Sequence, residues 1–273
     1  MPELPEVETI ARGLRAQLVG RQIASVALHR PSVFQGTRKD LMQLPGGVFE
    51  SVQRGGKYLV LVIRKGAVRW QLMTHLGMSG QLVVDAMSAA VLKHTHFEVA
   101  LEDGRWLRFR DPRRFGKVAL ARAPEAGFAA ALGIASGAEP LEVGEDAFVR
   151  LFAGRAAPIK NALMNQRLLR GVGNIYADES LHRAGLDPRA KRVSRPRLAR
   201  LRRELRSVLE EAIAAGGSSI SDYVASDGQP GWFHVQHRVY GRDGQPCGTC
   251  RRPIRRIVLA GRSAHFCPVC QKR

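Results

Sequence analysis

Short apolar runs between about residues 22 and 121 give this part of the chain the pattern of a β-rich domain. Glycine and aspartate turn signals separate the runs, and little of this stretch has helical spacing. About eight short strands at such intervals predict a β-sandwich or barrel. The runs are Ile23–Leu28, Val48–Val52, Tyr58–Ile63, Val68–Met73, Gln81–Val84, Phe97–Leu101, Trp106–Phe109 and Val118–Leu120.

An amphipathic helix is predicted ahead of these strands. Its apolar residues recur at spacings of three and four, which places them on one helical face. They are Val7, Ile10, Leu14 and Leu18. We expect this helix to cover one end of the sandwich.

The apolar spacing becomes helical after about residue 145. The stretch Ala123–Gly144 is rich in Ala, Gly, Pro and Glu and is interpreted as the connection between two domains. Helices are then predicted over Phe148–Phe152, from Pro158 towards Leu169, from Ile175 onwards and over Leu198–Ile213. The pattern as a whole predicts an α+β protein with four parts. These are an N-terminal sandwich domain (1–130), a linker (131–144), a helical domain (145–225) and a cysteine-containing end (226–273).

The charge of the chain points to a polyanionic partner. The formal net charge is +19 for 30.0 kDa, with a pI near 11.0. Nucleic acid is the simplest such partner, and a basic solubility surface or an anionic membrane is the alternative. The arginines opposite the apolar face of the last helix are either solvated or help to steer DNA. They are Arg200, Arg202, Arg203 and Arg206.

Two features predict a cytoplasmic location. No window approaches 18 uninterrupted apolar residues, so no membrane-spanning helix is expected. The N-terminus carries glutamates where a signal peptide would carry Lys or Arg.

All four cysteines lie near the end of the sequence as two C-x2-C pairs, Cys247/Cys250 and Cys267/Cys270. Two thiolate pairs at this spacing fit one tetrahedral Zn²⁺, and the stretch between the pairs is long enough for a β-hairpin. Two disulfides are the alternative, which a reducing cytosol disfavours. Four protein ligands leave no open position, so we expect a structural ion.

The start of the chain is a candidate nucleophile. Removal of Met1 would expose the secondary amine of Pro2, and a terminal amine titrates near pH 7.7–8.0, well below lysine. Such an amine attacks an aldehyde-level carbon to give an iminium, and Glu3 beside it could exchange protons. The alternative is an ordinary helix start, with Pro in the first turn and carboxylates at the positive end of the dipole.

Four motifs together resemble bacterial formamidopyrimidine-DNA glycosylase. They are the start Pro2–Glu8, the segment Asp111–Gly116 (DPRRFG), the segment Gly171–Ala177 (GVGNIYA) and the four-cysteine ribbon. They are separate, occur in the family's order and span nearly the whole chain. The sister family, endonuclease VIII-like glycosylases, usually opens Pro-Glu-Gly-Pro-Glu, so Leu4 favours the first family. That sister family, which prefers oxidised pyrimidines, and a non-catalytic zinc-ribbon DNA-binding protein remain the alternatives.

The resemblance implies a fold and an activity. The fold is an N-terminal β-sandwich with a leading helix, a helix–two-turns–helix domain and a zinc ribbon, with duplex DNA lying between the halves of a monomer. The enzyme flips an oxidised purine out of the stack. Pro2 would displace the base from C1′, and β,δ-elimination would then cut the strand.

The resemblance also assigns catalytic residues. Glu3 would handle protons at the sugar, and Glu6 would either support it or act only on the helix dipole. Lys57 would bind phosphate and assist elimination, whereas a lone lysine beside a strand is usually only solvated. Arg262, between the cysteine pairs, matches the ribbon arginine that grips phosphate at the lesion.

The remaining assignments concern DNA. Met78, Arg113 and Phe115 would fill the hole left by the flipped base, although Met78 and Phe115 would otherwise be taken as core. Asn174 would meet phosphate at a helix N-terminus, or serve as an ordinary N-cap. Further DNA contacts or supports match His94, Arg155 and Lys160. The base-reading loop is expected between residues 216 and 236.

Overall fold

The computed structural model describes residues 1–86, 88–122, 136–218 and 231–273. The chain forms two compact units. One comprises residues 1–134 together with 216–231, and the other comprises residues 135–215 together with 232–273.

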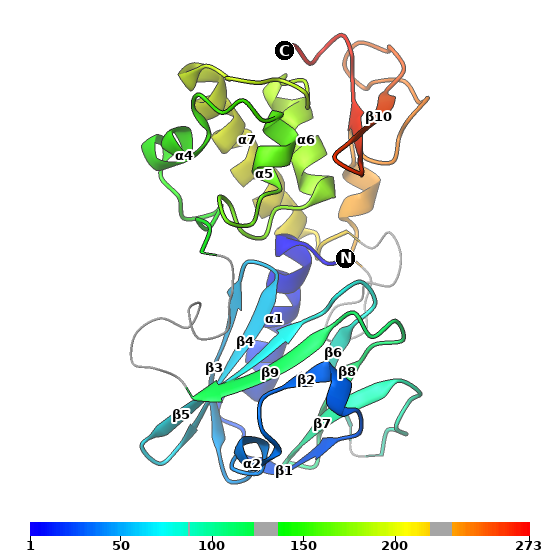
Figure 1. Ribbon diagram of the computed structural model, residues 1–273. Helices are drawn as coiled ribbons and strands as arrows, with labels where there is room; N and C mark the ends of the chain where they lie inside the picture. Colours follow the sequence, from blue (N-terminus) through cyan, green and yellow to red (C-terminus); the bar gives the residue numbers. More distant parts are fainter. Residues whose placement is uncertain (87, 123–135, 219–230) are drawn as a thin grey trace. The chain divides into compact units, whose positions relative to one another are not determined.

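The first unit is a β-sandwich with a leading helix, as predicted (Figure 1). One sheet has the order β1-β7-β8-β6, and the other has the order β2-β9-β5-β4-β3. The strands are β1 (Ile23–Leu28), β2 (Phe34–Gln35), β3 (Val48–Gly55), β4 (Tyr58–Lys65), β5 (Val68–His75), β6 (Gln81–Asp85), β7 (Thr95–Leu101), β8 (Trp106–Arg110) and β9 (Lys117–Arg122).

Helix α1 (Leu4–Leu18) completes the sandwich core. It lies beside β3 and β4 (Figure 1) and also contacts β6. The four apolar residues that predicted it are 0–2% exposed and pack in one cluster with residues of both sheets. Burying one aliphatic side chain of this size contributes roughly 1.5–3 kcal/mol, so the packed face holds the helix against the sheets.

Three small elements in this unit were not predicted. They are η1 (Pro31–Val33), β2 and α2 (Arg38–Leu41). The two residues of β2 pair in parallel with β9. Elements of two to four residues are too short to show a period.

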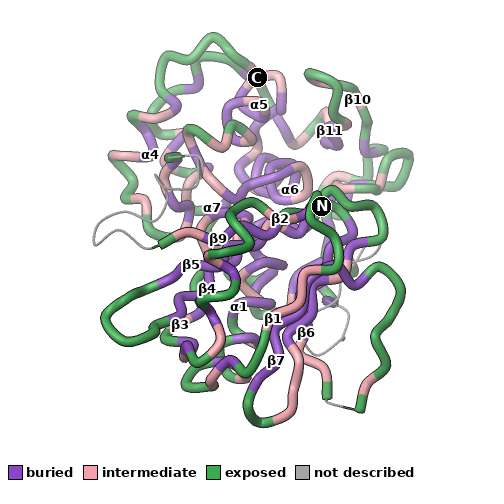
Figure 2. Tube along the Cα trace, turned by 60° about the horizontal axis from the view of Figure 1, so that its bottom comes forward, coloured by how far each residue is buried: buried purple, intermediate pink, exposed green. Residues whose placement is uncertain are grey.

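The second unit is helical and ends in a β-hairpin. Figure 2 shows α6 buried along most of its length. The elements are α4 (Glu145–Phe152), α5 (Ile159–Leu163), α6 (Asn174–Ala184), α7 (Arg195–Ala214), η2 (Phe233–Gln236), β10 (Arg255–Leu259) and β11 (Arg262–Phe266).

The prediction of a helix from Pro158 towards Leu169 is wrong at its end. Helix α5 stops at Leu163, and polar side chains then replace helical backbone bonds. The side chain of Asn165 accepts from the N–H of Arg167, and that of Gln166 bonds to the backbone of Gly171. Asn and Gln side chains that bond to the backbone in this way compete with the helix.

The arginines on the outer side of α7 bond within their own unit. Arg202 donates to the carbonyl of Val143, and Arg203 pairs with Glu145. Arg206 pairs with Glu210 one turn along the same helix. Arg203 and Arg206 nevertheless remain largely exposed, so this face is a solvated surface that carries local ion pairs. Among the described residues, no helix is long and apolar enough to cross a membrane.

Candidate active site and nucleic-acid interface

The N-terminal cluster is organised by the carboxylate of Glu6. Glu6 is 2% exposed, and its Oε2 accepts the backbone N–H of Glu3 at 2.8 Å. Its Oε1 accepts the backbone N–H of Ser218 at 2.8 Å. One buried side chain thus bonds to the start of α1 and to the residue just before 219–230. Its position at the helix start is also favourable for a carboxylate, so the two interpretations of Glu6 are compatible.

Charged groups of the first unit act on the N-terminal amine. Burial lowers the pKa of the Met1 amine below its ordinary value of 8.0. Glu3 and Glu6 oppose this shift, whereas the positive charges of Lys57 and Arg113 lower the pKa further. The fold therefore brings all four predicted charged residues close enough to influence this amine, and the net direction favours the neutral, nucleophilic form.

Lys57 lies in the turn between β3 and β4, where Gly55 pairs with Tyr58. It is only 8% exposed, so the expectation that a lysine beside a strand is solvated does not hold. The positive charge of Lys57 therefore lies within the group of charged residues around the N-terminal amine.

His75 is a member of this cluster that the sequence analysis missed. Burial lowers its pKa, and the charges of Lys57 and the terminal amine lower it further. Its Nδ1 accepts the N–H of Gly77 at 3.2 Å, which fits a neutral ring with the proton on Nε2. The ring also packs against Tyr58, with centroids 4.8 Å apart. His75 therefore adds an uncharged polar group to the site.

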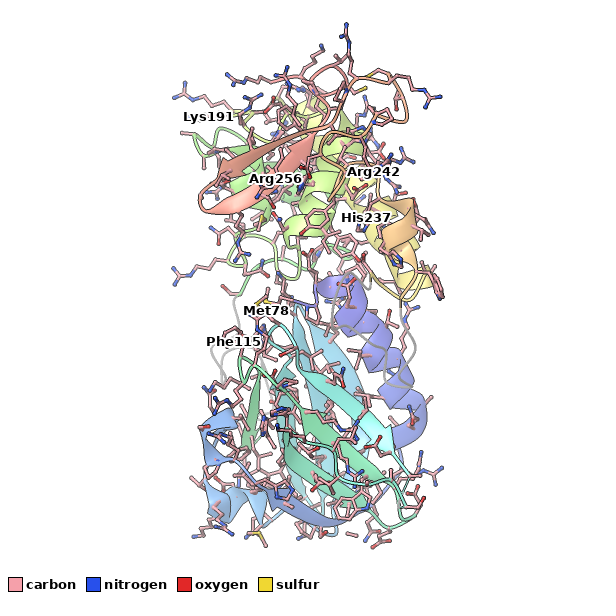
Figure 3. All side chains as sticks on the ribbon, turned by 90° about the vertical axis from the view of Figure 1, so that its right-hand side faces the viewer. Met78, Phe115, Lys191, His237, Arg242 and Arg256 are labelled. Carbon is pink, nitrogen blue, oxygen red and sulfur yellow. The ribbon has the colours of Figure 1, made fainter. Side chains whose placement is uncertain are left out.

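Met78 and Phe115 lie near each other at one end of the sandwich unit (Figure 3). Met78 is 41% exposed and Phe115 is 56% exposed, which excludes the interpretation that they are core residues. The guanidinium of Arg113 stacks over the Phe115 ring at 4.9 Å. Exposed large apolar side chains beside an arginine form a surface suited to insertion between bases.

His94 and Arg155 are exposed loop residues in different units. His94 has a positive φ of 69°, and Arg155 precedes α5. Both side chains are accessible to a phosphate.

Asn174 and the ribbon hairpin meet within the second unit. Asn174 is the first residue of α6, and the N-cap is Gly173, so the N-cap alternative is wrong by one position. The Nδ2 of Asn174 donates to the Oγ of Ser263 at 3.2 Å, while its Oδ1 is buried without a hydrogen-bond partner. Arg262 is exposed beside Ser263 at the start of β11. The N-terminus of α6 is therefore bonded to the residue that directly follows Arg262.

Lys160 is buried and supports the same junction. It is 1% exposed, and its Nζ pairs with Asp178 at 2.6 Å and donates to the carbonyl of Ser263 at 2.5 Å. Asp178 also accepts the backbone N–H of His265 at 2.8 Å. A side chain held in this way positions the hairpin and is not accessible to DNA, so of the two roles considered for Lys160 the structure fits support.

Glu179 holds the chain that leads into the ribbon. Its buried carboxylate accepts three consecutive backbone N–H groups, those of Arg238, Val239 and Tyr240, at 2.8–2.9 Å. Three donors offset the cost of burying this charge.

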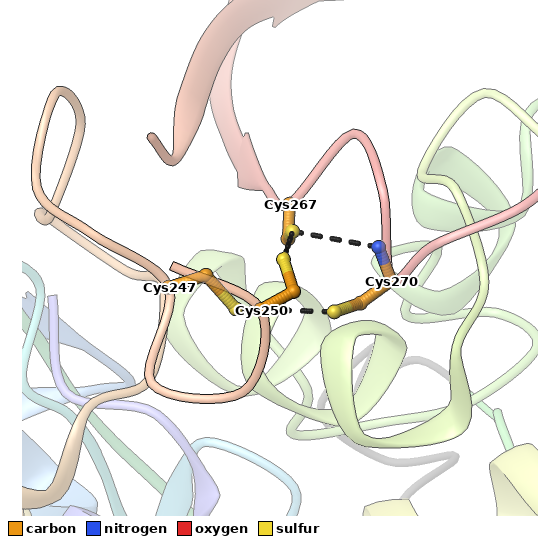
Figure 4. A group of neighbouring side chains, drawn as sticks. All are labelled: Cys247, Cys250, Cys267 and Cys270. Carbon is orange, nitrogen blue, oxygen red and sulfur yellow. Dashed lines mark hydrogen bonds between the residues drawn. The ribbon is translucent and has the colours of Figure 1, made fainter. Parts of the chain in front are cut away.

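The four cysteines converge on one point (Figure 4). Their Sγ atoms all lie within 4.8 Å of one another. The sulfurs of Cys250 and Cys267 are 3.3 Å apart and those of Cys247 and Cys270 are 3.9 Å apart, far beyond a disulfide bond. A tetrahedral ZnS₄ site has sulfurs about 3.8 Å apart, from a Zn–S distance of about 2.3 Å. The residues fit one structural zinc ion and exclude the disulfides.

Family models match three segments of the chain. The formamidopyrimidine-DNA glycosylase N-terminal domain matches residues 1–118, and the formamidopyrimidine-DNA glycosylase H2TH domain matches residues 136–224. A zinc finger found in FPG and IleRS matches residues 244–273. The chain thus carries a zinc-finger module, and its four cysteines hold a structural zinc ion.

Relatives match over the full length. The formamidopyrimidine-DNA glycosylases of Solibacter usitatus and Paracoccus denitrificans are 45% and 42% identical, with 100% of each chain covered. The MutM (Fpg) protein of Thermus thermophilus is 40% identical, with a TM-score of 0.86 over 99% of this chain and 98% of that one. A Lactococcus lactis Fpg variant solved with DNA containing Fapy-dG is 33% identical, with a TM-score of 0.90 and 100% of both chains covered.

A non-catalytic zinc-ribbon protein would account only for the last matched segment, whereas the matches extend to the N-terminal domain. The chain belongs to the formamidopyrimidine-DNA glycosylase family of DNA glycosylases with AP lyase activity.

Proposed function

We propose that this enzyme excises oxidised purines, such as 8-oxoguanine opposite cytosine and formamidopyrimidines, from double-stranded DNA and then cleaves the abasic strand. The observation that carries the proposal is the polar cluster at the start of the chain, where buried Glu6 holds the backbone of Glu3 beside Pro2. The charges of Lys57 and Arg113 also lower the pKa of the Met1 amine, one residue from Pro2. The Lactococcus lactis relatives solved with Fapy-dG DNA and with abasic-site DNA support it. The net charge of +19 suits a polyanionic substrate.

In the proposed reaction, loss of Met1 frees the amine of Pro2, which attacks C1′ of the extruded nucleotide. The C1′–N bond breaks, and its electron pair leaves with the base, which takes up a proton. The amine loses its proton, the sugar ring opens between C1′ and O4′, and O4′ takes up a proton. The resulting iminium is an electron sink. Loss of a C2′ proton then expels the 3′ phosphate, and a second elimination expels the 5′ phosphate.

Residues around the amine share the proton and charge transfers. Glu3 exchanges protons with the sugar, and Glu6 holds the backbone of Glu3 in place. The charge of Lys57 adds to burial in lowering the pKa of the Met1 amine, and we expect the same direction at the Pro2 amine. Lys57 also binds phosphate and assists elimination. The neutral ring of His75 adds no competing positive charge that would repel an iminium.

The exposed surface at the end of the sandwich stabilises the extruded state. Met78 and Phe115 fill the space vacated by the damaged base, which offsets part of the unstacking cost of a few kcal/mol. Arg113 donates hydrogen bonds to the orphaned base opposite. Its stacking on Phe115 keeps the guanidinium plane aligned with that ring.

Residues of both units bind phosphates. Asn174 at the N-terminus of α6 and Arg262 on the ribbon contact the phosphates at the lesion. His94 and Arg155 make further DNA contacts, and Lys160 supports the hairpin from beneath. The base-reading loop proposed for residues 216–236 lies mostly outside the described residues.

The proposal extends to organisation and location. As functional divisions we propose a catalytic sandwich (1–130), a linker (131–144), a helix–two-turns–helix domain (145–225) and a lesion-loop end with the zinc ribbon (226–273). We further propose that the enzyme acts as a monomer in the cytoplasm, where a reducing environment keeps the four cysteines from forming disulfides and available to zinc.

Borohydride trapping on duplex DNA containing 8-oxoguanine tests the proposal, because only an iminium gives a covalent adduct. We expect an adduct with the wild-type protein and a loss of most adduct with Pro2→Gly, which replaces the secondary amine by a less suitable primary one. Glu3→Gln should bind the lesion and turn over slowly. Full activity of protein shown by mass spectrometry to retain Met1 contradicts the nucleophile assignment.

A lesion panel is the companion experiment. Excision of oxidised pyrimidines in preference to 8-oxoguanine would instead indicate the specificity of the endonuclease VIII-like family.

A further inference from the structure

One buried carboxylate, that of Asp111, joins the loops that carry the proposed DNA-wedge residues. Asp111 is 0% exposed and follows β8. Its Oδ1 accepts the hydroxyl of Ser79 at 2.6 Å, and its Oδ2 accepts the backbone N–H of Gly116 at 2.7 Å. Ser79 directly follows Met78, and Gly116 directly follows Phe115. The two exposed apolar side chains are therefore each one residue from a group bonded to this carboxylate.

The bonds around Asp111 continue to Arg113 and His94. The Oγ of Ser79, which donates to Asp111, also accepts the backbone N–H of Arg113 at 3.2 Å. The backbone N–H of Asp111 donates to the carbonyl of His94 at 3.1 Å. The carbonyl of Asp111 accepts a hydrogen bond from His96 Nε2 at 2.9 Å. Ser79 and Gly116 thus share the carboxylate of Asp111, and the His94 segment joins them through the backbone of Asp111.

The backbones of the Met78 loop and the Arg113–Phe115 loop are in direct contact at Gly77 and Gly116. Gly77 has a φ of +63°, and a Cβ added to it would lie 2.5 Å from the nitrogen of Gly116. A Cβ on Gly116 would lie 2.8 Å from the carbonyl oxygen of His75. Neither position accepts a side chain without separating the loops, so hydrogen bonding and steric fit act together.

We infer that Asp111 is a positioning residue that holds the loops of Met78, His94 and Arg113–Phe115 as one preformed wedge for duplex DNA. This inference rests on the proposed function. A wedge that is already ordered pays little conformational entropy when it enters the base stack, whereas three independent loops would each have to be ordered on binding. Asp111 touches neither the N-terminal amine nor the surface offered to DNA, so it acts through the residues it holds.

The inference predicts different effects on two substrates, a lesion in duplex DNA and an abasic site in a single strand, although the same nucleophile acts on both. In a duplex, extrusion leaves a hole and an orphaned base, so the wedge is needed. A single-stranded oligonucleotide with an abasic site has no partner strand and no hole to fill, and its cleavage needs only the amine cluster. Loss of the preformed wedge should therefore lower duplex excision and spare single-strand cleavage.

Asp111→Asn is the direct test. Its amide offers one acceptor oxygen in place of two, so either Ser79 or Gly116 loses its acceptor. We expect kcat/KM on duplex 8-oxoguanine to fall between about 10- and 100-fold, the effect of a lost bond to a charged group. Cleavage of the single-stranded abasic oligonucleotide and borohydride trapping on it should stay at the wild-type level.

Two variants complete the experiment. Ser79→Ala removes only the hydroxyl bridge, so it should give the same selective loss with a smaller magnitude, and it decides the matter if Asp111→Asn does not fold. Asp103→Asn removes an equal charge from the exposed turn between β7 and β8, where the carboxylate pairs with Arg105, and should change neither activity.

Equal loss on both substrates, or no loss on either, in folded Asp111→Asn and Ser79→Ala overturns the inference and leaves the proposed function standing. Absence of a trapped adduct with the wild-type protein on both substrates contradicts the proposed function itself, and with it the inference.

Discussion

The carboxylate of Glu6 accepts the backbone N–H of Ser218 at 2.8 Å across a sequence separation of 212 residues. Its other oxygen accepts the N–H of Glu3, one residue beyond the proposed nucleophile Pro2. The start of α1 and the chain that enters residues 219–230 are therefore bonded to the same side chain. A substitution of Glu6 would therefore alter hydrogen bonds at both Glu3 and Ser218.

Glu6→Gln should destabilise the first unit and slow base excision. The amide keeps one acceptor and turns an NH₂ group towards an N–H donor, so one buried donor loses its partner at a cost of about 1–3 kcal/mol. Urea unfolding and single-turnover excision of 8-oxoguanine measure the two effects. Glu50→Gln is the control, because Glu50 is an exposed carboxylate of the same unit that pairs with Arg69. Equal stability of the two variants would contradict the bridging role.

Lys57→Met should move the acidic limb of activity to higher pH. Together with burial, the positive charge of Lys57 lowers the pKa of the Met1 amine, and we expect it to act in the same direction on the Pro2 amine one residue along. Without it that pKa rises, so the amine becomes protonated at a higher pH and loses nucleophilicity sooner as the solution is acidified. The rate of borohydride trapping on abasic DNA, measured against pH, shows the shift.

Lys65→Met supplies the matched control for that experiment, because Lys65 is an exposed lysine that donates to the carbonyls of Gln43 and Pro45. Its pH profile should match the wild type. A Lys57→Met profile that is unshifted, or shifted to lower pH, would refute the electrostatic role.

Arg113→Ala should flatten the preference for the base opposite the lesion. Cytosine offers O2 and N3 as acceptors to a guanidinium, whereas adenine presents a different edge. The expected loss is about 1–3 kcal/mol of discrimination, the size of one good base contact. Excision of 8-oxoguanine opposite each of the four bases, at two salt concentrations, measures it.

Arg114→Ala is the control for general charge, because Arg114 is the exposed neighbour of Arg113. It should weaken binding to every duplex alike and reduce the salt slope by about one unit. An unchanged cytosine-to-adenine ratio in Arg113→Ala would rule out base readout by this residue.

Cys247→Ser should release zinc and weaken DNA binding while leaving the sandwich folded. Metal binding and folding are coupled at such sites, with free energies on the order of 10 kcal/mol. The sandwich core contains no residue of the ribbon, so its unfolding transition should be unchanged. Metal analysis and denaturation of the purified variant check both parts. A zinc stoichiometry near zero in active wild-type protein would contradict the structural role of the ion.

The sequence predicts the large elements well, because each one buries a regular apolar face. The eight strand runs and the leading helix follow from that rule, and the zinc ligands follow from spacing alone. The end of α5 could not be predicted, because Asn165 and Gln166 divert the chain through side-chain bonds that leave no periodic signal. Elements β2 and α2 could not be predicted either, because two to four residues are too few to show a period.

The sequence predicts most residues of the candidate site but not their burial or their hydrogen-bond partners. The burial of Lys57 depends on packing around a hairpin turn that looks solvent-exposed in the sequence. The sequence places Asp111 in the motif Asp111–Gly116 but shows no role for it, because its partners Ser79 and Gly116 come together only in the folded structure. His75 and Ser218 were missed for the same reason. A polar residue flanked by glycines in a loop is the signal that could have identified Ser79.

The hydrogen bonds between Glu179 and residues 238–240 have a consequence for which substitutions these positions tolerate. The carboxylate bonds only to backbone, so these bonds place no demand on the side chains of residues 238–240. Proline is the exception at each of the three positions, because it has no N–H to donate. Glu179 is instead fixed in kind, since a shorter carboxylate would not reach and an amide would oppose the donors. Among these three positions only Arg238 is exposed, so homologues should vary more at Arg238 than at Glu179.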